Sequence, residues 1–415
     1  MAKDPSAGGG RNVVFVLGGQ AVSLLGDYVA LLALPLFVVD LTGSAFDLGL
    51  TTTFETVPTL LFGFAAGVVL DRVSLRRALI VADLARGAAF ALLALAVFTD
   101  AATLWMVFAV AFLVGTMTVG FDSGFQAWLP SLVPPGTLVS INARLQVIRT
   151  SAWTLGPPIA GFLATGFGGF QAAFLLDAGT FLVSALVILV LREIRPRPTV
   201  ERAPWMASFR EGLTTLWRLR ALRASTLAAA LVNAVFAAME ALLVLFALER
   251  LGLERGTLVG WFYAGHALLG AAGVALAPRL ISAAGLGRSF VIGLLMLGGG
   301  FAGLNLAAPW IEGLTPVFSL LVSIVPAGIA VAGVSITNVA FFTLRQQLPP
   351  PDQLGRVIAA SRTLSWALLP IGPLIGGVAA ERFGLGVVYG TASGLLLVVA
   401  LSLIGSALWH TASAD

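Results

Sequence analysis

Long apolar segments separated by short charged turns dominate this chain. From about Ala45 to Leu70 almost every residue is apolar, and after Arg77 a second apolar run continues to about Phe98. A helix needs ~20 such residues to cross a bilayer, and both runs reach that length. The sequence therefore predicts two membrane-spanning helices joined by a short charged turn.

The same alternation continues to the end of the chain. Hydrophobic residues make up 58% of the 415 residues and charged residues only 11%, which is too apolar for an ordinary soluble domain. The first ten residues are small and polar, so no cleavable secretory signal is evident. We expect twelve spans, at about 12–39, 45–70, 78–98, 103–125, 138–165, 170–191, 223–248, 257–281, 289–308, 315–342, 355–380 and 386–409.

These spans predict an all-α membrane protein built from two six-helix halves. The halves cover residues 12–191 and 223–409, with terminal tails at 1–11 and 410–415. The linker 192–222 carries three prolines and most of the chain's clustered arginines. Its part from Trp205 to Leu219 has the apolar spacing of a short amphipathic helix on the membrane surface.

The basic residues predict the orientation in the membrane. With the amino terminus inside, most of the 24 Lys and Arg residues fall in inner segments, and only Arg250, Arg255 and Arg382 fall in outer ones. Short loops rich in Arg or Lys stay cytoplasmic, so we expect both termini inside a cytoplasmic (inner) membrane. The excess of positive charge is therefore a matter of topology and does not indicate nucleic-acid binding.

Several classes of activity are excluded by residue types. The chain has no Cys, which removes thiol catalysis and thiolate metal sites. Lys3 is the only lysine, so no Walker A lysine is available. His266 and His410 are far apart and offer no metal-ligand spacing. We expect neither an enzyme nor a bound metal or cofactor.

Asp27 is the clearest functional candidate. It lies in the middle of the first predicted span, on a polar stripe with Gln20. An ionisable group near the bilayer centre is costly and normally faces a cavity or a partner. Burial favours the protonated form of a carboxyl group, which suits a proton carrier. The alternative is a structural carboxyl group that is hydrogen-bonded across helices.

Glu240 and Glu55 are two further acidic candidates. Glu240 lies in the seventh span with Asn233 two turns away on the same face, and a functional and a structural role are equally compatible with that position. Glu55 lies closer to the outer side, where it would be solvated at the mouth of a cavity. Tyr263 and His266, one turn apart in the eighth span, complete the candidate cavity, although a lone histidine between helices is more often a satisfied polar contact.

The remaining charges within spans have simpler interpretations. Asp83 and Arg86 are three residues apart on one helix and can neutralise each other. Arg149 and Arg362 occupy matching positions in the two halves, which favours snorkelling or the closing of an inner gate over substrate contact. Asp177 has no obvious partner in the sequence and receives no role.

The charged turn between the second and third spans carries a resemblance. Gly67, Asp71, Arg72, Arg76 and Arg77 form the pattern Gly-x-x-x-Asp-Arg-x-x-x-Arg-Arg. This pattern resembles the signature loop of the major facilitator superfamily of secondary transporters. The resemblance implies a gating latch in which Asp71 docks on a helix of the other half. It also implies that Asp122 in the fourth span pairs with Arg72 or Arg76.

A second motif repeats in both halves. Gly156-Pro157-Pro158-Ile159-Ala160-Gly161 resembles the antiporter motif that exporters of this superfamily carry in the fifth span, with Ala160 in place of a glycine. Gly372-Pro373-Leu374-Ile375-Gly376-Gly377 restates it in the eleventh span. The first half's Arg149, Trp153 and Pro157 match Arg362, Trp366 and Pro370 at the same spacing. A duplicated fold around a midplane cavity is what the resemblance implies.

The likeness is strongest to one branch of the superfamily. Residues 24–36, the turn at 41–44 and residues 74–86 look like the branch that includes macrolide efflux pumps and the enterobactin exporter. The resemblance implies proton-coupled export of a small lipophilic molecule, such as a drug or a siderophore, by a monomer in the lipid bilayer. An importer or lipid flippase of the same fold is the alternative, and a non-transporting receptor or scaffold is a third possibility.

Overall fold

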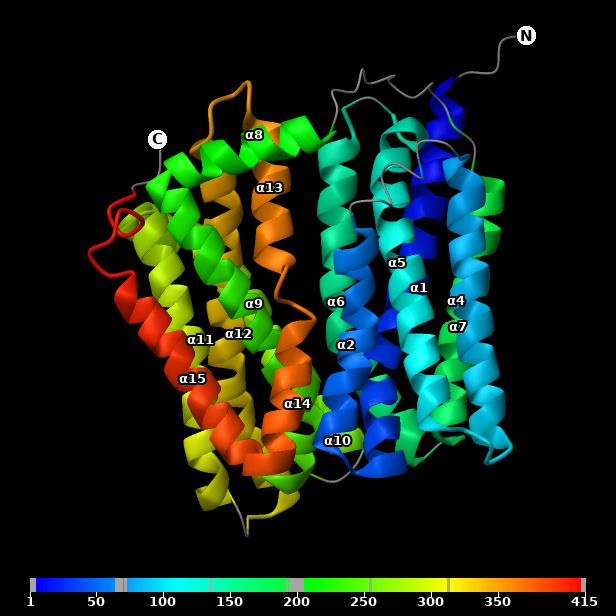
Figure 1. The fold of residues 1–415 in the computed structure, drawn as a ribbon. Helices are drawn as coiled ribbons and strands as arrows, with labels where there is room; N and C mark the ends of the chain where they lie inside the picture. Colours follow the sequence, from blue (N-terminus) through cyan, green and yellow to red (C-terminus); the bar gives the residue numbers. More distant parts are fainter. Residues whose placement is uncertain are drawn as a thin grey trace. The chain divides into compact units, whose positions relative to one another are not determined.

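The computed structural model describes residues 5–63, 70, 73–134, 136–166, 168–191, 193, 205–253, 256–311 and 314–411. Every regular element in these ranges is a helix (Figure 1), so the all-α prediction is confirmed. In chain order the helices are α1 (Pro5–Thr42), α2 (Ala45–Phe62), α4 (Leu75–Phe98), α5 (Leu104–Leu132), α6 (Leu138–Thr165), α7 (Gly169–Val190), α8 (Trp205–Arg218), α9 (Arg220–Glu249), α10 (Thr257–Ala284), α11 (Leu286–Ile311), α12 (Pro316–Gln347), α13 (Leu354–Trp366), α14 (Ile371–Phe383) and α15 (Leu385–Ser402).

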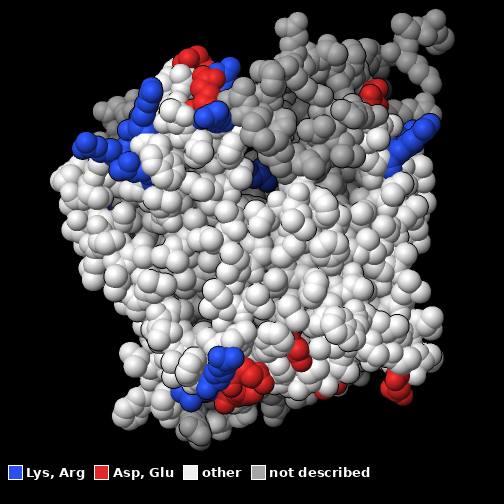
Figure 2. Space-filling view, in the orientation of Figure 1, with Lys and Arg blue, Asp and Glu red and all other residues white. Residues whose placement is uncertain are grey.

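Ten segments in the described part of the chain are long and apolar enough to cross a membrane, with α13 and α14 together forming one of them. The long helices α2 and α6 lie outside this set because α2 is rich in threonine and α6 is interrupted by polar residues and prolines. Adding these two gives the twelve predicted spans. Figure 2 shows charged side chains gathered near the ends of the helices, with a broad band between them that is almost free of charge. This is the distribution that a bilayer requires.

The chain forms two compact units. Unit 1 comprises Met1–Gly43, Phe54–Val200 and Arg255–Trp261, and unit 2 comprises Ser44–Thr53, Glu201–Glu254 and Phe262–Asp415. Unit 1 is formed mainly by the chain up to Val200 and unit 2 mainly by the chain after it, with two short exchanged segments. The beginning of α2 belongs to unit 2, and the beginning of α10 belongs to unit 1.

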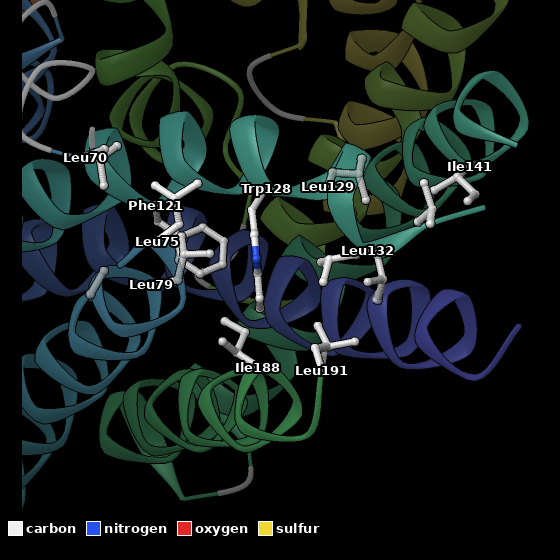
Figure 3. Close-up of a cluster of buried hydrophobic side chains, with 13 residues drawn as sticks. Leu70, Leu75, Leu79, Phe121, Trp128, Leu129, Leu132, Ile141, Ile188 and Leu191 are labelled. Carbon is white, nitrogen blue, oxygen red and sulfur yellow. The ribbon is translucent and has the colours of Figure 1, made fainter. Parts of the chain in front are cut away.

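In unit 1, α1 packs against α6 and α7, and α4 packs against α5 and α7. An apolar cluster closes one end of this unit (Figure 3). Trp128 points from α5 into its centre and is fully buried, with Ile188 and Leu191 on the far side. The indole Nε1 of Trp128 donates a hydrogen bond to Glu193 Oε1 at 2.7 Å, so the polar atom of this buried ring is satisfied.

In unit 2, α11 packs against α12 and α15, and α9 packs against α13 and α14. Small residues allow these close approaches, as expected for helices in a membrane. A Cβ atom at Gly333 would lie 2.5 Å from the carbonyl oxygen of Gly293, and one at Gly300 would lie 2.6 Å from that of Pro326. The short helix α8 runs across the ends of the bundle beside α13 (Figure 1).

Several helix boundaries differ from the sequence-based expectation, including the start of α1, the end of α15 and the middle of the eleventh span. The helix α1 begins at Pro5, so residues 5–11 are helical where a tail was expected. Proline suits the first turn of a helix because its φ is already helical. An N–H group in the first turn has no partner within the helix, so its absence in proline costs nothing there. The helix α15 ends at Ser402, which is earlier than the expected Trp409.

The third difference is a break in the eleventh span, which was expected to be one continuous helix. Residues 367–370 separate α13 from α14. The amide of Leu369 donates to the carbonyl of Trp366 at 3.1 Å, and that of Ile371 donates to the carbonyl of Leu368 at 3.1 Å, so the four-residue spacing is lost. Pro370 has no N–H and its ring crowds the preceding turn, which explains the interruption.

Candidate functional site

Asp27 lies on α1 in unit 1 and is partly buried. The charged groups that act on it are Arg86, Asp122, Asp83 and Arg149, in decreasing order of influence. Helices α4, α5 and α6 contribute these groups, so the packing of unit 1 places acids and bases from three helices around Asp27. The role of Asp27 stays a prediction.

Asp83 and Arg86 form an ion pair within α4, and the two side chains are 0% and 2% exposed. The Arg86 guanidinium lies between two aromatic rings, 4.5 Å from the centroid of Phe121 and 4.2 Å from that of Phe181. Its Nη1 also donates to Thr118 Oγ1 at 3.4 Å. Arg86 is thus held by an anion, two ring faces and a hydroxyl group, which suits a guanidinium in a low-dielectric interior.

Asp177 on α7 is a buried acid to which the sequence assigned no role. Its side chain is fully buried, and Thr180 Oγ1 donates to Asp177 Oδ1 at 3.2 Å. Among the described residues, Oδ2 has no hydrogen-bond partner. Gly26 of α1 lies directly against Asp177 and Thr180, where a Cβ atom would collide with both. Because Gly26 precedes Asp27, this contact brings the two aspartates together across the α1–α7 interface.

Glu55 and Gln20 are more loosely placed in unit 1. The side chain of Glu55 is exposed within the unit and acts electrostatically on Asp27. Its backbone oxygen lies against Gly115, which allows α2 and α5 to approach closely. Gln20 is partly buried on α1. Glu55 therefore sits near the acidic cluster without being enclosed by it.

The candidates in unit 2 form a different environment. Glu240 on α9 is partly buried and acts electrostatically on Tyr263 of α10 and Tyr389 of α15. Tyr389 donates from its hydroxyl group to the carbonyl of Met239 at 2.7 Å. His266 is 1% exposed and packs against the rings of Phe262 and Tyr263, with centroids 5.0 and 5.1 Å away.

The amide of Asn233 on α9 contacts the break in the eleventh span. The Nδ2 of Asn233 donates to the carbonyl oxygen of Ser365 at 2.8 Å. This carbonyl lies in the last turn of α13, where the normal helical donor is missing. Asn233 thus satisfies a backbone group that would otherwise be costly inside a membrane.

The two repeated motifs build matching contact surfaces. In unit 1, Gly156 of α6 lies against Tyr28 of α1, and Gly161 lies against the backbone of Gly256. A Cβ atom at Gly260 would lie 2.5 Å from the carbonyl oxygen of Pro157. The motif glycines therefore let backbones touch on two faces of α6, as small residues do in membrane helices.

The α14 motif repeats this arrangement in unit 2. Gly372 lies against the carbonyl of Ala234, and a Cβ at Gly376 would lie 2.9 Å from the Cβ of Ala238, both on α9. On another face, Pro373 lies against Gly49, and a Cβ at Gly377 would lie 2.8 Å from the carbonyl oxygen of Ala45. The Oγ1 of Thr53 donates to the carbonyl of Pro370 at 3.1 Å.

The two arginines of the motif helices, Arg149 and Arg362, both lie near aromatic side chains. The Arg362 guanidinium lies 5.3 Å from the ring centroid of Trp366. Arg149 acts electrostatically on Tyr28, whose ring is parallel to that of Trp153 with centroids 6.0 Å apart. Both arginines are exposed within their own units. The role of the two arginines stays a prediction.

Part of the expected latch lies outside the described residues, namely Gly67, Asp71 and Arg72. Arg76 donates from Nε to the carbonyl of Ile188 at 3.3 Å and from Nη2 to that of Leu189. It therefore caps the carboxyl end of α7, where the helix dipole favours a cation. Arg77 and Asp122 are exposed.

A two-unit helical membrane protein with enclosed carboxyl groups and closely packed glycine helices belongs to the class of membrane transporters. The chain belongs to the Major Facilitator Superfamily, whose family model matches residues 16–370. The resemblance seen in the sequence is thereby confirmed. Members of this family are transporters and not enzymes, so the expectation that the chain is not an enzyme is confirmed.

Two relatives and one solved structure agree with this assignment. The chain is 23% identical over 378 residues to macrolide efflux protein A of Streptococcus pyogenes, covering 89% of each protein. It is 26% identical over 386 residues to the multidrug efflux pump Tap of Mycobacterium tuberculosis, covering 89% of this chain and 87% of that protein. A bacterial homologue of the iron transporter ferroportin, solved in an inward-facing state, superposes with a TM-score of 0.73 at 18% identity, covering 95% of this chain and 98% of that one.

Proposed function

We propose that this transporter exports a small lipophilic molecule in exchange for protons. The efflux names of the relatives at 23–26% identity support the direction of transport. The acidic cluster around Asp27 supports proton coupling, and it is the observation that carries the proposal. A carboxyl group that is partly buried among charges of both signs can exist in two protonation states at moderate energetic cost.

In the proposed cycle, the carrier alternates between two states that favour different ligands. Substrate binds from the inside, and protonation of Asp27 or Glu240 from the outside favours its release. A ligand shifts such an equilibrium only by its difference in affinity for the two states, so one proton-sensitive site is sufficient for exchange. The latch at Asp71 and Arg72 stabilises the outward-open state in this proposal.

The energy source in this proposal is the proton gradient, with no bound cofactor. A monomer in the cytoplasmic membrane, with both termini inside, is sufficient for the cycle. The substrate is a drug-like or siderophore-like molecule, because the relatives include a macrolide pump and a multidrug pump.

The test is transport by purified protein in proteoliposomes under an imposed pH gradient. The panel contains a macrolide such as erythromycin, a tetracycline and a catecholate siderophore, and it compares the wild type with Asp27→Asn. Asp100→Asn, in the exposed turn after α4, serves as the matched control. The proposal is supported if the wild type moves a solute under the pH gradient and Asp27→Asn loses this movement but still binds the solute.

Other outcomes separate the alternatives. If Asp27→Asn transports normally, Asp27 is not the coupling acid and Glu240 becomes the next candidate. The same assay on Glu240→Gln then tests Glu240. Movement of solute in the same direction as protons flowing down their gradient would indicate symport, as in an importer. If wild type moves none of these solutes under either direction of gradient, the assignment as a proton-driven exporter of these solutes is wrong.

A further inference from the structure

The search outside the predicted site leads to Asp177, which the proposed cycle does not use. It is an acid in the middle of a membrane helix and its side chain is fully buried. A buried carboxylate normally has a cation or several hydrogen-bond donors as partners. Asp177 has a single hydroxyl donor, Thr180, and its second oxygen has no partner within the described residues.

The charges on the neighbouring helices do not balance Asp177. Helix α7 packs against α1, α4 and α6. Among the charged side chains, Asp27 and Arg86 act directly on Asp177, and Asp83, Asp122 and Arg149 act on Asp27. Arg86 is already paired with Asp83. Arg149 and Asp122 are exposed. The remaining cluster consists of the buried Arg86, Asp83 and Asp177 and the partly exposed Asp27.

This inventory contains three carboxyl groups and one guanidinium. With every group ionised, the enclosed cluster would carry a net negative charge in a region of low dielectric, where such charge is costly. The Arg86 guanidinium offsets one of the three carboxyl charges, so electrical neutrality of the cluster requires protons on two of these groups. Asp83 is the ion-pair partner of Arg86, which leaves Asp27 and Asp177 as the two groups to be protonated.

The geometry gives the two aspartates different access to solvent. Asp27 is partly exposed, whereas Asp177 is completely enclosed behind Gly26. Substitution of Gly26 by a larger residue would fill the space between α1 and the Asp177–Thr180 pair. The absence of a side chain at Gly26 thus keeps the carboxyl groups of α1 and α7 in one shared environment.

We propose that Asp177 is a second exchangeable proton site, which forms with Asp27 a two-carboxyl coupling site across α1 and α7. Asp27 exchanges its proton with solvent, and Asp177 exchanges through Asp27. The proton passes as H⁺ between carboxyl groups, so each transfer leaves one group neutral and the other anionic. This inference deepens the proposed proton-driven function, because it predicts that one more proton is bound per cycle than Asp27 alone can carry.

The first test needs no substrate, so it is independent of the transport assay. Infrared difference spectra of the purified full-length protein are recorded between acidic and alkaline buffer. The wild type is expected to show C=O stretch bands of protonated buried carboxyl groups, two of which belong to Asp27 and Asp177. Asp177→Asn should lose one of these bands and retain the other. Asp27→Asn should keep the Asp177 band but change the pH at which it appears.

Two further variants keep the test decisive. Thr180→Val removes the hydroxyl donor and should shift the frequency of the Asp177 band, even if Asp177→Asn folds poorly. Asp100→Asn lies in an exposed turn and should leave both buried bands unchanged. If Asp177→Asn retains both bands, or if Thr180→Val leaves every band in place, Asp177 does not exchange a proton and the inference is wrong.

Transport stoichiometry supplies the second arm once a substrate is known from the panel above. The ratio of protons to substrate is measured from the substrate gradient that just balances an imposed pH gradient. Asp177→Asn is expected to carry one proton fewer per substrate than the wild type. An unchanged ratio would overturn the inference while leaving the proposed function intact, whereas absence of transport in the wild type would count against the proposed function itself.

Discussion

Arg86 is the residue whose surroundings most constrain unit 1. It is 2% exposed, paired with Asp83 and enclosed between Phe121 and Phe181. Removal of one partner from a buried ion pair leaves an uncompensated charge and costs about 3–5 kcal/mol. We therefore expect Arg86→Met to lower the melting temperature of the purified protein strongly, as measured by thermal denaturation in detergent.

The matched control removes both charges together. Asp83→Asn combined with Arg86→Met leaves no buried ion, so much of the lost stability should return. Replacement of a whole buried pair by neutral residues is often close to neutral in energy. A double variant as unstable as Arg86→Met alone would show that packing between the two rings, and not the charge, stabilises this part of the protein.

A second prediction at this scale concerns two glycines on the same helix. A Cβ atom at Gly26 would collide with Thr180 and Asp177, whereas Gly18 has no atom within 4 Å of its Cβ position in the described structure. Overpacking of an interior costs about 1–3 kcal/mol. Gly26→Ala should therefore lower the melting temperature, while Gly18→Ala should leave it unchanged or raise it slightly.

This comparison also tests the interface between α1 and α7. If both alanine variants behave alike in the same denaturation assay, the two helices are not in close contact at Gly26. If only Gly26→Ala is destabilised, the same variant becomes useful for the infrared experiment, since it changes the surroundings of Asp177 without removing a charge.

Among the elements, α8 shows how a surface helix is held. Its Leu216 is buried against Leu222 and Val357, and Gly212 lies against the backbone of Arg356 at the start of α13. Glu211 accepts a bond of 2.5 Å from Arg356, but both side chains are about half exposed. The apolar and backbone contacts should therefore stabilise the docked helix more than the ion pair does.

The difference is measurable with two variants. Glu211→Gln removes an exposed ion pair and should cost only about 0.2–1 kcal/mol. Gly212→Ala places a Cβ against backbone atoms and should cost about 1–3 kcal/mol. Limited proteolysis near α8 reports whether α8 has detached in each variant. Gly355→Ala serves as the control, because a Cβ atom at Gly355 meets no atom within 4 Å in the described structure. If Glu211→Gln detaches α8 more than Gly212→Ala does, the ion pair stabilises the docked helix more than the apolar and backbone contacts do.

At the element scale, the sequence predicted most of the fold because membrane helices satisfy their own backbone bonds. The amphipathic helix expected at 205–219 is found at Trp205–Arg218. The break in the eleventh span was missed, although the proline that causes it was visible. Pro157 and Pro158 sit inside the continuous helix α6, so proline alone does not decide where a helix breaks. The donor from Asn233 to Ser365 is a tertiary contact that no local pattern reveals.

The candidate site was predicted only in part for the same reason. Asp27 stood out because it lies mid-span on a polar stripe of its own helix. Asp177 did not, because the features that single it out are the approach of Gly26 on another helix and an unpartnered oxygen. Asp122 was expected to pair with Arg72 or Arg76, and this stays a prediction because Arg72 lies outside the described residues. The described contacts of Arg76 with carbonyls at the end of α7 are tertiary contacts that the sequence does not reveal.

At the scale of the whole molecule, the asymmetric distribution of arginine predicts an orientation that labelling can test. The chain has no cysteine, so a single introduced thiol is the only one present. Ala101, in the turn after α4, and Ala283, near the end of α10, are both exposed. A membrane-impermeant maleimide added to intact cells should label Ala101→Cys and leave Ala283→Cys unlabelled until the membrane is opened. The reverse pattern would invert the predicted topology.

The two exchanged segments affect how the protein is made. Synthesis delivers the first six-helix half long before Arg255–Trp261, the segment that completes unit 1 beside Gly161 of α6. Domains usually fold in turn as they leave the ribosome. Here unit 1 cannot be completed until Arg255–Trp261 has been synthesised. A nascent chain truncated after Glu249 should therefore be cut in α6 by protease more readily than one truncated after Ala284. Equal resistance would mean that the first half matures by itself.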